Sequence, residues 1–562
     1  MAGALSGRPR RREIGSPEAA GQQTLGALLE AQARTVPGAA FIIFDDLRGQ
    51  VTTRTYREFD REVNRVAHLL YRLGVGRGDT ITLLLANCLE FLALWFGAAK
   101  LGTVIVPVNT ASSASELEFL VGHSESRLIF TDASRLDLAR QVRDRCSGVK
   151  EVLVCGDGAP SSEVDFGLRV AACPDIPPEG PALLPTDEAA ILYTSGTTAR
   201  PKGVLVTHAN YICAGETVAR AVRLTPDDRH LVVLPLFHGN AQYYSTMSAL
   251  VTGASVALMA RFSASRYFDQ AIAHRCSVSS LFAAPIRMLL AQPRRPEHAR
   301  NGLRAVIFAQ SVTPAQLSEW HERFRAPLLQ LWGMTETMGP PIINPLDGER
   351  RNMSMGLPVP GYASRLVDED GRSVARGDIG QIVVRGEPGR SLMKGYHKNP
   401  EATAETLRDG WLWSGDNARQ DEDGYYHFVD RAKDMIKRSG ENVAASEVEA
   451  VIREHPGVFD CAVIGVPDAL RDEAIVAVVV PRAAEGDVPA VAVTEDEVLI
   501  WCRERLASFR VPQFVRFRAE LPRTAVGKIR KHVLRAEFHS RAGGGGSGSG
   551  PGPSATRLGT AG

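Results

Sequence analysis

The chain has 562 residues, of which 44% are hydrophobic and 23% are charged, an ordinary composition for a globular protein. Since a domain usually has roughly 100–200 residues, this length predicts several domains. The 65 basic residues nearly balance the 64 acidic ones, and a net charge of +1 disfavours nucleic acid as a partner. Eight cysteines without a CxxC pair or a zinc-ligand spacing predict free thiols and a cytoplasmic location.

The two ends of the chain have compositions that do not favour a folded core. Residues 1–22 are rich in Ala, Gly, Pro and Arg, and we expect them to be disordered. Residues 541–562 are expected to form a flexible tail, because Gly, Ser and Pro predominate there. The longest apolar stretch, residues 91–108, is interrupted by Lys100 and by glycines, so we expect no insertion into a membrane.

Between residues 24 and 285, helical patterns alternate with short apolar and β-branched runs. Residues 79–85 predict a buried strand, which is followed by a helix over 90–101 and a second strand over 103–108. Strand, helix and strand in series predict a parallel sheet covered by helices. Further strands are expected at residues 127–131, 151–154 and 229–234.

The pattern changes twice in the second half of the chain. Turn clusters separate short strands from residue 351 to residue 430, which predicts a small antiparallel or barrel-like β-rich part. A compact unit of helices and strands follows from about residue 446. Its expected helices cover residues 447–454 and 494–506, and its expected strands cover residues 461–466, 475–480 and 513–517. The fold class is therefore a multidomain α/β protein that ends in a small α+β domain.

A hydroxyl-rich segment follows a predicted strand at residues 190–193. Hydroxyls and backbone amides at the end of a strand form a concave site for anions, and a lysine adds positive charge, which suits a triphosphate. The sequence lacks the GxxxxGK[ST] pattern of a Walker A loop, and a strand follows at residues 204–206, with Thr207 as the expected helix cap. A turn without a ligand is the alternative. The segment contains Thr194, Ser195, Gly196, Thr197, Thr198 and Lys202.

Six motifs follow one another along the chain. They are YTSGTTARPKGV (193–204), LPLFHG (234–239), LWGMTET (331–337), WSGD (413–416), DRAKDMIKRSGENV (430–443) and PRTAVGK (522–528). Together they resemble the adenylate-forming superfamily of acyl-CoA synthetases, luciferases and peptide-synthetase adenylation domains, over residues 24–538. IKRSGENV (436–443) and RDEAI (471–475) are most similar to acyl-CoA ligases of the crotonobetaine/carnitine-CoA ligase type.

The resemblance implies a domain plan. A large domain over residues 23–429 would combine two α/β subdomains with the β-rich part. A small mobile domain over residues 430–540 would rotate about a hinge at Asp430. A homodimer is left open.

The resemblance also implies a two-step reaction that uses ATP, Mg²⁺ and coenzyme A. The carboxylate of a small-molecule acid attacks the α-phosphate of ATP to give acyl-AMP and pyrophosphate, and the CoA thiol then displaces AMP. Lys528 is the implied catalytic cation of the first step, because an ammonium stabilises the negative charges that meet there. A solvated basic run near the chain end is the alternative for Lys528.

Individual contacts come from the same resemblance. The loop of residues 194–202 would hold the β- and γ-phosphates, Thr335 would contact the α-phosphate, and Glu336 would ligate Mg²⁺, which prefers hard oxygen ligands beside phosphates. Trp332 would pack on adenine, and Asp416 and Arg431 would contact the ribose. A surface turn for Glu336 and a core position for Trp332 are the alternatives. The other implied cofactor contacts are Gln310, Gly333 and Met334, and Lys437, Gly440 and Glu441 in the loop that helps to form the pantetheine tunnel.

His238 borders the acyl pocket that the resemblance implies and is a candidate catalytic residue; a satisfied buried histidine is the alternative. Many peptide-synthetase domains have an aspartate there, and its absence disfavours an α-amino acid as substrate. Mixed aromatic and polar residues suit a medium or bulky organic acid, as found in specialised metabolism. The pocket is expected to involve residues 238–244, Ala284, residues 309–312 and residues 333–337.

Three departures from the family pattern lie around the expected adenylate. Ala199 replaces the glycine that usually follows the hydroxyl-rich loop, Ala309-Gln310-Ser311 occupies a segment that is usually small and glycine-rich, and Trp332 replaces the usual tyrosine. They define an alternative to a complete acyl-CoA ligase: an enzyme impaired in adenylation, which converts an acyl-adenylate from a partner enzyme into the CoA thioester. An enzyme that loads a carrier-protein thiol, a nucleotide-binding relative without turnover and a luciferase-like oxygenase also stay open.

Overall fold

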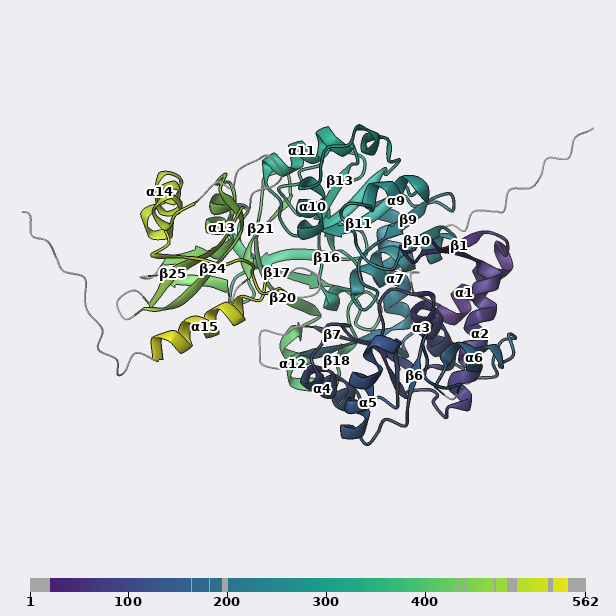
Figure 1. The fold of residues 1–562 in the computed structure, drawn as a ribbon. Helices are drawn as coiled ribbons and strands as arrows, with labels where there is room; N and C mark the ends of the chain where they lie inside the picture. Colours follow the sequence, from purple (N-terminus) through teal and green to yellow (C-terminus); the bar gives the residue numbers. More distant parts are fainter. Residues whose placement is uncertain are drawn as a thin grey trace, which may run out of the picture. The chain divides into compact units, whose positions relative to one another are not determined.

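A computed structural model of the chain describes residues 21–162, 164–180, 182–194, 201–431, 434–438, 441–468, 472–482, 493–523 and 529–543 (Figure 1). The chain divides into two compact units, and the boundary lies between Ala432 and Lys433. Of the two ends that we expected to be flexible, residues 1–20 and 544–562 lie outside the described residues.

The first sheet of the large unit, sheet 1, has a parallel centre of buried strands. The expected strand–helix–strand series is confirmed: β3 (Thr80–Leu84), α3 (Leu89–Leu101) and β4 (Val104–Pro107) follow one another, and the two strands pair in parallel. Both strands are apolar and buried on both faces, because helices cover a parallel sheet. In spatial order sheet 1 consists of β18 (Gly395–Tyr396), β8 (Lys202–Thr207), β7 (Glu188–Thr194), β4, β3, β5 (Leu128–Thr131) and β6 (Glu151–Val154).

The second sheet of the large unit, sheet 2, has the same character. Its central strands pair in parallel, and antiparallel strands close both edges. The strand expected at residues 229–234 is confirmed over Arg229–Val232. In spatial order sheet 2 consists of β15 (Leu357–Pro358), β14 (Ile342–Ile343), β13 (Leu328–Trp332), β12 (Ala305–Ala309), β11 (Val278–Phe282), β9 (Arg229–Val232), β10 (Ser255–Met259), β1 (Ala40–Asp45) and β2 (Val51–Thr55).

Most helices of the large unit bury their apolar residues in one core with both sheets, whereas the helices Ala114–Ser124 and Leu136–Arg145 pack in a second core against sheet 1. α2 shows the local rule: Thr55 and Glu58 form a capping box at its start, and Phe59, Val63 and Val66 form its buried stripe. α3 and α7 are buried on nearly all sides and meet where Trp95 lies 4.8 Å from Tyr211, ring to ring. The helices are α1 (Leu25–Thr35), α2 (Tyr56–Arg72), α3, α4 (Ala114–Ser124), α5 (Leu136–Arg145), α6 (Phe166–Ala171), α7 (His208–Ala221), α8 (Met247–Thr252), α9 (Tyr267–Ala273), α10 (Ala283–Leu290), α11 (Pro314–Phe324) and α12 (Pro400–Thr406).

The β-rich part of the large unit is an antiparallel sheet, sheet 3, as the turn clusters predict. β20 is bulged: Trp413 pairs with Val383 and Asn417 with Gln381, so residues 414–416 lie opposite one residue of β17. Gly415 has a φ of 72°, a conformation that favours glycine, at the centre of this bulge. Sheet 3 consists of β16 (Ala363–Val367), β17 (Ile379–Arg385), β20 (Trp411–Gln420) and β19 (Leu407–Arg408), with β21 (Tyr426–Arg431) paired to β20.

The small unit is a sheet, sheet 4, with helices on both faces. Alternate residues of its two longest strands enter different cores: Val463 and Ala477 pack with α13 and α14, whereas Ala462 and Val478 pack with α15. The two predicted helices and three predicted strands of this unit are confirmed, and β22, β23 and α15 are additional elements that the sequence analysis did not predict. The elements are β22 (Met435–Arg438), β23 (Glu441–Ala444), α13 (Ala445–Arg453), β24 (Val458–Asp468), β25 (Asp472–Pro481), α14 (Glu495–Arg505), β26 (Phe514–Phe517) and α15 (Lys531–Gly543).

Two further expectations concern the whole chain. All eight cysteines are free thiols, as predicted. Among the helices of the described residues, none has the length and hydropathy that crossing a membrane requires.

Candidate active site

The hydroxyl-rich segment connects two antiparallel strands of sheet 1. β7 ends at Thr194 and β8 begins at Lys202; these residues pair, and Thr194 Oγ1 donates to the Lys202 carbonyl at 3.4 Å. Thr207 caps α7 through a capping box with Asn210, as predicted. The predicted phosphate contacts Ser195, Gly196, Thr197 and Thr198, together with Ala199, lie outside the described residues.

Lys202 lies beside Tyr396, a residue that the sequence analysis missed. Lys202 Nζ lies 4.9 Å from the centre of the Tyr396 ring, and the Tyr396 hydroxyl donates to Glu336 Oε1 at 2.9 Å. Tyr396 lies here because β18 pairs with β8, with Tyr396 opposite Val204. Burial and the Glu336 carboxylate raise the pKa of Tyr396, so the hydroxyl keeps its proton and remains a donor. The only signal in the sequence is a Gly-Tyr pair before a helix start at Pro400, which indicates a turn.

Glu336 is a nearly buried carboxylate, with 6% of its surface exposed. It lies in a single 3₁₀ turn, Thr335–Thr337, and its carbonyl accepts from the Met393 amide at 2.9 Å. Across the described ranges, no group of three or more His, Cys, Asp and Glu side chains forms a metal cage. A carboxylate of this kind suits Mg²⁺, which keeps several waters and shares its other ligands with phosphates.

The segment that leads to Glu336 is closely packed. A Cβ atom on Gly333 would lie 2.7 Å from the Tyr244 hydroxyl oxygen, so only glycine fits there. The Thr337 hydroxyl accepts from the Met334 amide at 3.0 Å, and the Tyr362 hydroxyl donates to the Thr337 carbonyl at 3.1 Å. These contacts fix the backbone on both sides of Thr335 and Glu336.

Three of the predicted nucleotide contacts meet at sheet 3. Trp332 Nε1, at the end of β13, donates to Asp416 Oδ2 at 2.9 Å, and Arg431 Nε lies 3.3 Å from Asp416 Oδ1. Asp416 and Arg431 pair between β20 and β21. The Trp332 ring packs in an apolar cluster with Ile342 and Met355. The structure therefore brings these three side chains together around one carboxylate.

Asp430, the predicted hinge, is 3% exposed and precedes the unit boundary by two residues. Its carboxylate accepts from the Arg431 amide at 2.7 Å, and its backbone pairs with Asn417. Asp430 is thus a buried residue near the end of β21, the last described strand of the large unit.

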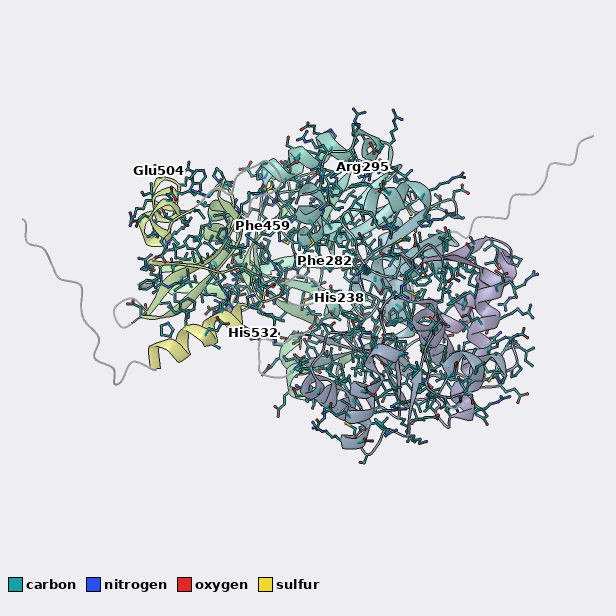
Figure 2. All side chains as sticks on the ribbon, viewed as in Figure 1. His238, Phe282, Arg295, Phe459, Glu504 and His532 are labelled. Atoms are coloured by element: carbon teal, nitrogen blue, oxygen red, sulfur yellow. The ribbon has the colours of Figure 1, made fainter. Side chains whose placement is uncertain are left out.

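His238 lies against Phe282 at the expected acyl pocket. The two rings are 5.7 Å apart and perpendicular, and Figure 2 shows both labels close together in the large unit. His238 Nδ1 accepts from the Asn240 amide at 3.3 Å. These contacts give the ring a fixed place.

The residues after His238 form a buried π-helix, Asn240–Thr246. The Gln242 amide is used inside the protein, since it donates to the Leu236 carbonyl and accepts from the Tyr211 hydroxyl. Asn240 Oδ1 and the Tyr243 hydroxyl have no hydrogen-bond partner among the described residues. Such a wide turn with unpaired buried polar atoms is typical of a functional site.

Gln310 follows β12 directly and has a φ of 75°. A non-glycine residue in this left-handed region is uncommon, and such strain gathers at functional sites. Gln310 therefore has a backbone conformation typical of glycine, in a segment where the family usually has small, glycine-rich residues.

In the small unit, Lys437 lies in β22 and its amide donates to Glu473 Oε2 at 2.7 Å. Gly440 and the side chain of Glu441 lie outside the described residues. Lys528 also lies outside them, and the described residues stop at Arg523 before it and resume at Ile529 after it.

Both flanks of Lys528 are tied to one network of charges. Before it, Arg523 binds Asp460, and after it, Lys531 Nζ lies 2.8 Å from Glu449 Oε1. Arg453 joins the two carboxylates, at 3.1 Å from Glu449 and 2.9 Å from Asp460. Although burial raises it, Lys531 and Arg453 hold the pKa of Glu449 below its ordinary value. We call these residues the flank network.

Comparisons with known proteins agree with the motifs. A family described as "AMP-binding enzyme" matches residues 29–397, and one described as "AMP-binding enzyme C-terminal domain" matches residues 447–528. A crotonobetaine/carnitine–CoA ligase from Salmonella paratyphi B is 36% identical over 519 residues, which cover 92% of this chain and 99% of that protein.

Solved structures show the same similarity. ATP-bound MatB from Rhodopseudomonas palustris is 29% identical, with a TM-score of 0.81, and the match covers 92% of this chain and 99% of that one. The anthranilate CoA ligase AuaEII in complex with anthranoyl-AMP is 26% identical, with a TM-score of 0.84, over 93% of this chain and 98% of that one.

Proposed function

We propose that this chain, which belongs to the AMP-binding enzyme family and is an AMP-forming acid–thiol ligase, carries out both half-reactions of an acyl-CoA ligase. In the first, an oxygen of the acid attacks the α-phosphorus of ATP, and the bond to pyrophosphate breaks. In the second, the thiol sulfur of CoA attacks the acyl carbon. The bond to AMP then breaks, and the thiol proton is released.

The cluster of Lys202, Tyr396 and Glu336 is the observation that supports this proposal most. Lys202, the last residue of the hydroxyl-rich segment, lies 4.9 Å from the centre of the Tyr396 ring, and the nearly buried Glu336 carboxylate accepts from the hydroxyl of the same tyrosine. The lysine would neutralise charge on the β- and γ-phosphates. Glu336 would hold Mg²⁺, which when bound polarises the phosphate oxygens. A turn without a ligand has no need of a carboxylate and a lysine placed in this way.

Of the other predicted site residues, some would act in adenylation and some in thioester formation. Thr335 would contact the α-phosphate, and Asp416 and Arg431 would bind the ribose. Lys528 would stabilise the charge that builds up during adenylation. After a rotation about Asp430, the loop with Lys437, Gly440 and Glu441 would serve the pantetheine of CoA. One small domain could then act in both steps.

The substrate would be an organic acid of medium size that lies near His238, Phe282 and the π-helix. Two of the relatives named above are, by their names, CoA ligases for crotonobetaine or carnitine and for anthranilate, which are organic acids. An aromatic pair and unpaired buried polar atoms suit an acid with both an apolar body and a polar group. An α-amino acid is disfavoured, because His238 takes the place of an aspartate.

The test is to incubate the full chain with Mg·ATP, CoA and a panel of acids, and to measure pyrophosphate and acyl-CoA separately. In parallel, CoA is supplied with synthetic acyl-adenylates of the same acids. Thioester from acid and ATP is the expected result. Thioester from the adenylates alone would overturn the complete ligase and favour the enzyme that depends on a partner. Transfer to a carrier-protein thiol but not to CoA would favour the carrier-loading enzyme.

A further inference from the structure

Trp332 has two properties that a simple packing residue does not need. Its indole N–H donates to Asp416 Oδ2 at 2.9 Å, and both side chains are nearly buried, with 6% of Trp332 and 9% of Asp416 exposed. The two residues come from different sheets and are 84 positions apart in the sequence. A hydrogen bond to a carboxylate in such a place is stronger than one between neutral groups.

The bulge in β20 places the backbone of Asp416 but leaves its carboxylate to be oriented by side chains. The Asp416 amide donates to the Ser414 hydroxyl at 3.1 Å, and Gly415 makes the turn between them. Beyond that, the carboxylate is held by Trp332 on Oδ2 and by Arg431 on Oδ1. Arg431 is a partly exposed partner, with 40% of its side chain exposed, at the longer distance of 3.3 Å, so Trp332 is the stronger constraint.

A carboxylate has two oxygens and about four acceptor positions. Trp332 uses one on Oδ2, and Arg431 forms an ion pair with Oδ1, which leaves an acceptor position on each oxygen. Two acceptors on one planar group match the two neighbouring hydroxyls of a ribose. A rotated carboxylate would lose at least one of these positions.

We propose that Trp332 is a positioning residue that orients Asp416 to accept from both ribose hydroxyls, and that this gives the enzyme its preference for ATP over 2′-deoxy-ATP. Trp332 acts through Asp416, so this role rests on the assignment of Asp416 to the ribose in the proposed function. It differs from packing on adenine, because adenine is the same in both nucleotides.

The experiment compares the Kd of ATP and of 2′-deoxy-ATP for the full chain, with Mg²⁺ and without an acid. Trp332→Phe keeps an aromatic ring and removes the donor. Because a hydrogen bond to a charged group is strong, the preference for ATP should fall about tenfold. Trp320→Phe is the matched control: that indole is also buried and donates to the Ala326 carbonyl at 2.9 Å, but it lies outside the cluster around Asp416. It should keep the preference.

An equal loss of affinity for both nucleotides in Trp332→Phe would overturn the proposal and favour packing on adenine. An unchanged preference would overturn it too. Trp332→His, which keeps a ring N–H, should retain more of the preference than Trp332→Phe, and it decides the question if the phenylalanine variant fails to fold. Asp416→Asn distinguishes the assignment of Asp416 to the ribose from the positioning role of Trp332. If Asp416→Asn keeps the preference for ATP, the ribose assignment fails. If Asp416→Asn lowers the preference but Trp332→Phe does not, only the role of Trp332 fails.

Discussion

Replacing Tyr396 with phenylalanine removes one hydroxyl and leaves the ring beside Lys202. The lost contact is the hydrogen bond to Glu336 Oε1 at 2.9 Å, whereas the contact of Lys202 Nζ with the ring, at 4.9 Å, is kept. A hydrogen bond to a charged group contributes about 1.5–3 kcal/mol. If that energy holds Glu336 in place for Mg²⁺, adenylation should slow by about ten- to a hundredfold, since about 1.4 kcal/mol corresponds to a factor of ten.

The assay measures pyrophosphate release from acid and ATP over a range of Mg²⁺ concentrations, and thioester formation from a synthetic acyl-adenylate and CoA. Tyr396→Phe should slow the first reaction, raise the Mg²⁺ concentration that it needs, and leave the second unchanged. Tyr426→Phe is the control, because its hydroxyl donates to the Ser364 carbonyl at 2.9 Å within sheet 3. An equal loss in both reactions, or an unchanged Mg²⁺ requirement, would refute the role of Tyr396.

Three more outcomes are expected. Lys528→Ala should abolish pyrophosphate release and spare transfer from acyl-AMP; equal loss of both would contradict its role. Gln310→Gly should raise the free energy of unfolding in urea by about 1 kcal/mol, because it relieves a φ of 75°, and no gain would refute that strain. Burial lowers the pKa of His208 to about 4 and of His230 to about 3. Only the unfolded chain gains these protons between about pH 6.5 and about pH 4 for His208 or pH 3 for His230, so within that window each histidine should cost up to about 1.4 kcal/mol per pH unit in acid unfolding titrations.

Elements with a continuous local pattern were predictable from the sequence. β3, α3 and β4 lie within a residue or two of their expected bounds. Each is one continuous apolar segment, so its periodicity and its two ends can be recognised from neighbouring residues alone. β24, whose alternate residues fill two cores, was also recognised, although it extends the strand expected at residues 461–466 to Val458–Asp468. Thr207 was recognisable as a cap because a cap and its helix are neighbours in the chain.

Contacts that depend on strand register were not predictable. Tyr396 meets Glu336 across 60 positions because a two-residue strand pairs with β8. The bulge at residues 414–416 is defined by the pairing of β20 with β17, so the sequence WSGD alone does not predict it. Trp332 could be recognised as aromatic and unusual, but its partner could not, since Asp416 belongs to another sheet.

The flank network also has a consequence for how this chain can change over evolutionary time. Each charge in it has a partner of opposite sign, and removing one partner of a buried pair typically costs about 3–5 kcal/mol. Asp460 and Glu449 are 2% and 6% exposed, so water cannot replace a lost partner. Exchanges at Arg453, Arg523 and Lys531 should therefore be inherited together with exchanges at the two carboxylates. Related sequences should contain either the whole set or an apolar replacement of it, and intermediates should be rare.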